Sequence, residues 1–186
     1  MTKIQARNRL YLLLVAIVIG LLAPLVVYPV FLMKILCFAL FACAFNLLLG
    51  FTGLLSFGHA AFFGGAADVT GHALSVWGLP FELGILAGTL AATVMGAIVG
   101  KLAIRRQGIY FAMVTLALAQ LIYFLCLQAP FTGGENGQQG IPRGFALGIL
   151  DLSNNTTLYY VVLVIFALGF GLVYRVINSP FGQVLK

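Results

Sequence analysis

Charged residues are scarce in this chain. Only 8% of its 186 residues are Asp, Glu, Lys or Arg, whereas soluble domains carry about 25%. Hydrophobic residues make up 62% of the sequence, which is more apolar surface than a water-soluble globule of this length can bury. The scarcity of charge therefore excludes an ordinary soluble domain and indicates a protein whose solvent is largely lipid.

The chain also lacks the patterns of metal, redox and nucleic-acid sites. Its 3 cysteines, Cys37, Cys43 and Cys126, fall inside apolar stretches without C-x-x-C spacing, and we interpret them as small buried hydrophobic side chains. The net charge of +6 comes from basic residues scattered between apolar runs, with no basic patch. We therefore expect no metal, no cofactor and no nucleic-acid partner.

Apolar runs of helix length divide the chain. A helix needs about 20 apolar residues to cross the hydrocarbon core of a bilayer. The sequence therefore predicts an all-α, polytopic transmembrane helix bundle of about six spans that forms a single domain. The predicted spans cover residues 10–28, 31–49, 53–76, 83–104, 109–129 and 158–174. Residues 130–157 form a polar loop on the outer side, the one long loop of the prediction.

The basic residues predict the orientation of these spans. With six crossings and the N-terminus in the cytoplasm, eight of the ten lie on the cytoplasmic side: Lys3, Arg7, Arg9, Lys101, Arg105, Arg106, Arg175 and Lys186. Only Lys34 and Arg143 lie on the other side. This asymmetry follows the positive-inside rule and requires the third segment to cross fully. We expect both termini in the cytoplasm.

Small residues recur at every fourth position of the fourth span. They are Gly84, Gly88, Ala92, Gly96 and Gly100. A stripe of this kind lets a neighbouring helix approach closely. We therefore predict that this face packs against another helix.

The third segment carries an unusual polar face. Ser56, Ala60, Gly64, Asp68 and His72 recur at four-residue intervals, which places them on one side of a helix. A carboxylate costs about 2.5–3.5 kcal/mol at a bilayer centre, so Asp68 must face protein or water, with His72 as a possible partner. Two interpretations stay open for these residues and for His59: polar groups buried between helices, or the lining of a substrate path. The many glycines make this segment the one that favours a broken helix.

A helix start signal follows the sixth span. Ser179 suits an N-cap and Pro180 the first helical position. The sequence ends within the helix that this signal predicts. We therefore expect the chain to be truncated at its C-terminus.

Several blocks of the sequence resemble one family. The stretches at residues 46–64, 108–120, 131–137 and 178–182 are similar to LivM-type inner-membrane permeases of branched-chain amino-acid ABC importers. The resemblance runs through nearly the whole chain but covers only the N-terminal part of the family's length. Two residues depart from the family pattern. At Asp68 the family more often has a neutral Gly-Ala-Tyr run, and Gln139 is the second departure. Ser179, Pro180, Phe181 and Gly182 look like the start of the family's cytoplasmic coupling segment.

The resemblance implies a permease subunit and not an enzyme. The expected cargo is branched-chain or other hydrophobic L-amino acids, moved across the bacterial plasma membrane by alternating access. The implied partners are a second, LivH-like permease subunit, two ATP-binding cassette subunits that hydrolyse ATP, and a periplasmic substrate-binding protein. The bilayer surrounds the spans.

Other functions stay open at this stage. Related permeases with similar blocks carry urea, amides or other small polar solutes, and a truncated chain could be an inactive or purely structural membrane subunit. An intramembrane enzyme that uses Asp68 with His59 or His72 would need acid, base and nucleophile groups that converge. The other spans offer no such groups, and we therefore predict no catalytic residue.

Overall fold

The structure is a computed structural model that describes residues 19–53, 55–104, 108–146 and 150–179. After a helical stretch at residues 19–26, it contains α2 (Pro29–Thr52), α3 (His59–Ser75), α4 (Phe81–Ala103), α5 (Ile109–Gln128) and α6 (Asn155–Ile177). Two 3-10 turns, η1 (Pro130–Thr132) and η2 (Gly134–Asn136), and a two-residue antiparallel pair, β1 (Phe145–Ala146) and β2 (Leu150–Asp151), lie between α5 and α6. The predicted all-α class is confirmed.

Four helices in this part of the chain are long and apolar enough to cross a membrane: Pro29–Gly50, Phe81–Ala103, Ile109–Gln128 and Asn155–Ile177. They support a membrane-embedded helix bundle, as predicted. The third helix, α3, has 17 residues and is therefore about 25 Å long. Residues 10–18 of the predicted span 10–28 lie outside the described residues. The count of six spans and the cytoplasmic termini stay predictions.

Two helix boundaries differ from the sequence-based expectation. The third helix does not begin at residue 53, because Gly53 adopts a left-handed conformation (φ 65°) that ends α2. Helix α3 begins only at His59. The prediction that Ser56 belongs to the polar face of this helix is therefore wrong. At the other end, α6 begins at Asn155 and not at Leu158, because the Asn154 side chain caps it.

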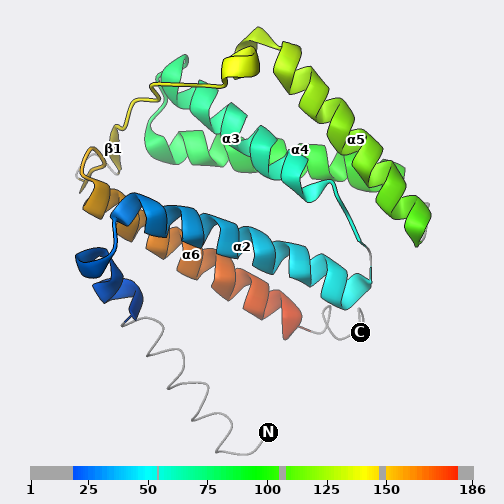
Figure 1. Cartoon of the computed structure of the whole chain (residues 1–186), viewed down its shortest axis with the longest axis horizontal. Helices are drawn as coiled ribbons and strands as arrows, with labels where there is room; N and C mark the ends of the chain where they lie inside the picture. Colours follow the sequence, from blue (N-terminus) through cyan, green and yellow to red (C-terminus); the bar gives the residue numbers. More distant parts are fainter. Residues whose placement is uncertain (1–18, 54, 105–107, 147–149, 180–186) are drawn as a thin grey trace, which may run out of the picture.

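The helices form two layers (Figure 1). One layer holds α2 and α6, and the other holds α3, α4 and α5. Successive helices from α2 to α6 run in opposite directions, as full crossings of a bilayer require. Within the first layer α6 comes very close to α2, since a Cβ at Gly169 would lie 2.9 Å from the Leu40 side chain. Tyr159 of α6 also donates a hydrogen bond to the Gly20 carbonyl at 2.6 Å.

Replacing Asn154 with alanine is expected to lower the free energy of unfolding by about 1 kcal/mol. The Asn154 Oδ1 accepts a hydrogen bond from the Thr156 backbone N–H at 3.0 Å, and that N–H loses its partner in the variant. Unfolding in a detergent titration measures the change. Asn154→Ser keeps an acceptor and should recover most of the stability; equal losses in both variants would contradict the capping role.

Candidate functional site

The small-residue stripe of α4 packs against α3 over only part of its length. A Cβ at Gly84 would lie 2.8 Å from the Leu74 side chain, and one at Gly88 would lie 2.7 Å from the Ala66 carbonyl oxygen. Gly96 and Gly100, in contrast, have no non-neighbouring atom within 4 Å of a Cβ position. The N-terminal half of the predicted stripe thus lies on α3, and the C-terminal half faces open space.

The opposite face of α4 carries the chain's apolar exterior. Its large aliphatic side chains are all more than half exposed: Leu86, Leu90, Val94, Ile98 and Leu102. They repeat at four-residue intervals, half a turn away from the glycines. A soluble protein would bury such a face, and its exposure supports contact with lipid.

The turn before α3 docks on α5. The Thr115 hydroxyl, in a residue that is only 1% exposed, accepts a hydrogen bond from the Phe57 backbone N–H at 3.3 Å. Ser56 is buried beside it, and its Oγ accepts from the Gly58 N–H at 3.3 Å. Ser56 therefore fixes the turn at the start of α3. The structure gives its hydroxyl a local backbone partner.

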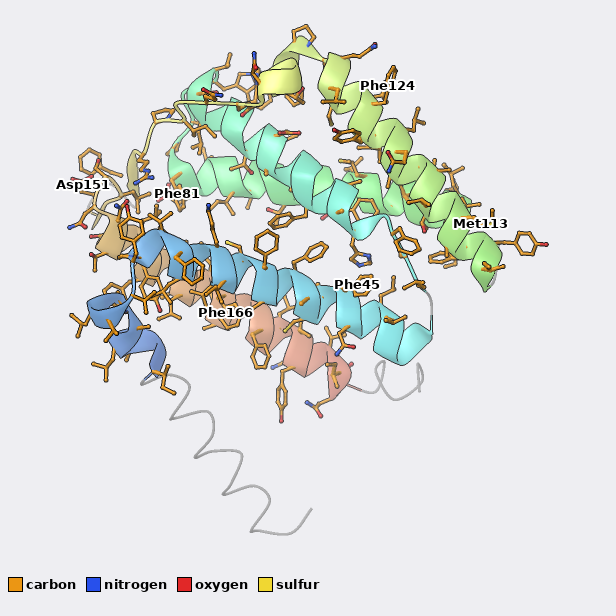
Figure 2. The ribbon with its side chains drawn as sticks, in the orientation of Figure 1. Phe45, Phe81, Met113, Phe124, Asp151 and Phe166 are labelled. Atoms are coloured by element: carbon orange, nitrogen blue, oxygen red, sulfur yellow. The ribbon has the colours of Figure 1, made fainter. Side chains whose placement is uncertain are left out.

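Aromatic rings join the two helix layers. On α2, Phe38 and Phe41 lie 6.2 and 5.5 Å from the Phe63 ring of α3, and Phe45 meets the His59 ring at 5.5 Å with an interplanar angle of 88°. Figure 2 shows Phe45 and its neighbours in the space between the layers. We call these five rings the aromatic seam. The two layers thus meet across rings and not through a close backbone contact like that of Gly88.

His59 has an unsatisfied nitrogen in this seam. Its Nδ1 is buried without a well-formed hydrogen bond within the described residues, and the ring lies beside the Ser56 backbone. Its ring also contacts Phe62 at 6.1 Å. Buried polar atoms are nearly always hydrogen-bonded, so an unpaired ring nitrogen between two layers is an exception that a bound water or solute would remove.

The remaining predicted site residues have separate surroundings. The Asp68 carboxyl group lies beside the Cys126 thiol of α5. The His72 ring lies 4.6 Å from Phe131 and 5.4 Å from Trp77. The structure therefore gives the two residues different partners, and the expected Asp68–His72 contact is not seen. Gly64 is exposed with no atom within 4 Å of a Cβ position.

The outer loop is fastened to α3 by Gln138. Its Nε2 donates hydrogen bonds to the backbone carbonyls of Asp68 and Phe131, each at 3.0 Å. Its Oε1 is buried without a hydrogen-bond partner and lies against Gly71, where any Cβ would overlap it. Thr132 anchors the same loop to the end of α5 by donating to the carbonyls of Cys126 and Ala129.

A cavity lies beside this loop, at the end of the molecule that we predict to be outside. Its volume is about 350 Å³ and it is partly open. Both helix layers contribute to its walls, together with the loop: Leu74, Phe81, Gln138, Gly140, Ile141, Pro142, Arg143, Leu152 and Leu158. Figure 2 places Phe81 at the same end of the molecule as Asp151 of β2.

Arg143 is the one charged residue in the cavity wall. Its Nη1 donates to the Asn155 Oδ1 at 2.7 Å. Asp151, on the nearby hairpin, is held by Ser153, whose backbone N–H lies 2.9 Å from the Asp151 Oδ1. These hydrogen bonds lower the pKa of Asp151, so this carboxylate stays ionised at neutral pH.

Sequence reasoning missed the importance of Gln138, Arg143 and Cys126. Gln138 bonds to the Asp68 carbonyl, 70 residues away, and Arg143 bonds to Asn155, 12 residues away. No local sequence pattern predicts these contacts. The one available signal was polarity, since Gln138 and Arg143 follow the glycine-rich turn of the outer loop. Among the residues that the structure describes, no group of three or more His, Cys, Asp or Glu side chains could hold a metal ion.

The fold defines a class: a membrane-embedded, all-α helix bundle with a polar loop over one end. The family can be stated as well. Residues 28–186 match the model of the branched-chain amino acid transport system / permease component family, and the chain belongs to that family of transport permeases.

Two curated proteins are similar to it, both described as the high-affinity branched-chain amino acid transport system permease protein LivM. The protein from Salmonella typhimurium is 26% identical over 162 residues, which cover 74% of this chain and 38% of that protein. The protein from Escherichia coli is 30% identical over 105 residues, or 56% of this chain and 25% of that protein. The chain thus spans well under half the length of these relatives. No solved structure matches it.

Proposed function

We propose that this chain is a permease subunit of an ABC importer that carries branched-chain or other hydrophobic L-amino acids inward across the bacterial plasma membrane. The observation that carries the proposal is the family match over residues 28–186. The similarity to two LivM proteins supports the choice of cargo.

The proposed assembly follows the same similarity. A second, LivH-like permease subunit would complete the membrane domain, two ATP-binding cassette subunits would bind ATP on the cytoplasmic side, and a periplasmic protein would deliver the amino acid. Of the proposed coupling residues, Ser179 lies at the end of α6, where its Oγ donates to the Val176 carbonyl at 2.7 Å. Pro180, Phe181 and Gly182 lie outside the described residues.

Alternating access needs two parts that can move against each other. Within one layer α4 lies close to the α3 backbone at Gly88, and within the other the Leu40 side chain of α2 lies against Gly169 of α6. The aromatic seam joins the two layers through side chains. We propose that the substrate path runs along this seam past His59 and Gly64, with Asp68 and His72 nearer its outer end. The unpaired His59 Nδ1 supports a polar group on that path.

Uptake into proteoliposomes tests the proposed function. The chain, reconstituted with its genomically neighbouring permease, ATPase and binding-protein partners, is expected to accumulate labelled L-leucine only when ATP is enclosed on the ATPase side. ATP can drive alternating access only if it binds more tightly to one of the two conformations of the transporter than to the other. A variant of the ATPase that binds but does not hydrolyse ATP provides the control.

Three results would change the assignment. Accumulation of urea or an amide with no accumulation of leucine would replace the cargo and keep the transport class. Accumulation without ATP would exclude coupling to the ATPases. If the complete assembly took up no solute that its binding protein recognises, the proposal would be rejected and an inactive subunit favoured.

A further inference from the structure

The cavity at the predicted outer end combines apolar walls with one cationic side chain. Leu74, Phe81, Leu152 and Leu158 supply aliphatic and aromatic surface from both layers. Arg143 supplies the charge. A volume of about 350 Å³ falls within the range of about 300–1,000 Å³ seen for small-molecule pockets, which are mostly apolar with a few polar groups.

The guanidinium of Arg143 is oriented for a ligand. Asn155 takes one of its N–H groups at 2.7 Å, and the guanidinium has five donors in a planar fork that matches a carboxylate. Asn155 is the first residue of α6, whose N-terminus carries a partial positive charge. Two positive features of different origin therefore meet at one side of the cavity.

A second polar side chain belongs to the loop. Gln138 lines the cavity, and its Oε1 is buried with no donor in the described part of the chain. Its Nε2 is already committed to two carbonyls, so the amide orientation is fixed by the structure.

We infer that this cavity is a binding site for a free L-amino acid with an aliphatic side chain. Arg143 binds the carboxylate, and Leu74, Phe81, Leu152 and Leu158 surround the side chain. The inference rests on the proposed function and adds to it a residence site on the permease itself, before the seam. The hydrophobic walls account for a preference for leucine-like over polar amino acids.

Binding of labelled L-leucine to the purified chain in lipid nanodiscs tests the site without partners or ATP. Arg143→Gln is expected to raise the dissociation constant at least about tenfold, because a charge-assisted bidentate contact is lost. Arg175→Gln removes the same charge at the other end of α6 and is expected to leave binding unchanged. Helical content by circular dichroism checks that both variants fold.

Ligand analogues and a filling variant make the test independent of Arg143. L-leucinamide lacks the carboxylate and is expected to compete at least about tenfold more weakly than L-leucine. Glycine lacks the side chain and should also compete poorly. Ile141→Trp places a larger ring in the cavity wall and is expected to abolish binding, whereas Ile19→Trp, on an exposed face remote in sequence, should not.

The outcomes separate this inference from the proposed function. If the assembled transporter takes up leucine but the chain alone binds none, or if Arg143→Gln and Arg175→Gln bind equally well, the cavity is not an amino-acid site and the transport proposal stands. If leucinamide competes as well as leucine, the role of Arg143 is overturned. Binding that depends on Arg143 together with failed uptake would keep the site and reject the transport proposal.

Discussion

Replacing Gly88 with alanine is expected to lower the free energy of unfolding by about 1–3 kcal/mol, the usual range for overpacking a close contact. A Cβ there would lie 2.7 Å from the Ala66 carbonyl oxygen and would overlap the Thr70 hydroxyl. Thr70 cannot turn away without cost, because its Oγ1 already donates to that carbonyl at 2.8 Å. The backbones of α3 and α4 must therefore separate.

Gly96 is the matched control on the same stripe. It lies two turns further along α4 and has no atom within 4 Å of its Cβ position. Alanine favours a helix over glycine by about 1 kcal/mol, so Gly96→Ala is expected to leave stability unchanged or raise it. The same substitution should thus have opposite signs at two positions that the sequence pattern treats as equivalent.

Trp77 gives the measurement a local reporter. It is the only tryptophan of the chain and contacts His72 at the C-terminal end of α3. Its fluorescence in an SDS titration of protein in mixed micelles follows the loss of α3 packing. Equal stability of Gly88→Ala and Gly96→Ala would contradict the close approach of α3 and α4.

The helices that the sequence predicted well are those that depend on local sequence features. Apolar length placed α2, α4 and α5 within a few residues, and four-residue spacing predicted that the α4 stripe packs on a helix. Spacing could not say that Gly84 and Gly88 contact α3 while Gly96 and Gly100 do not, because that depends on where the neighbouring helix starts. The late start of α3 at His59 depends on the left-handed conformation of Gly53. The sequence has several glycines in this stretch and does not show which of them adopts that conformation.

The candidate site was harder to predict than the fold. Asp68, His59 and His72 stood out because polar groups are costly in a span, yet their partners come from other helices. Cys126 is a neutral thiol on α5 and carried no signal until the structure placed it beside Asp68. Arg143 was predicted only as an outer-side cation, and its place in a cavity wall follows from the folding of the loop over both layers.

Replacing Gln138 with leucine is expected to release the outer loop from α3. The substitution keeps a similar volume but removes two hydrogen bonds of 3.0 Å, to the Asp68 and Phe131 carbonyls. The bond to Asp68 is half-buried and the bond to Phe131 is exposed, so the loss of each costs about 0.5–1.5 kcal/mol. Since about 1.4 kcal/mol corresponds to a factor of ten, the loop should open at least several-fold more often.

Hydrogen exchange of the loop amides measures this opening. The Gly133 and Gly137 N–H groups, bonded within the loop at 3.2 Å each, should exchange faster in Gln138→Leu. The adjacent Gln139→Leu is the matched control, because Gln139 is exposed and makes only a 3.4 Å bond to the Asn136 carbonyl. Leucine binding should weaken with Gln138→Leu alone, since the loop forms one wall of the cavity. Equal exchange in the two variants would mean that the loop stays in place without Gln138, and that Thr132 and the cavity's apolar side chains are sufficient to hold it.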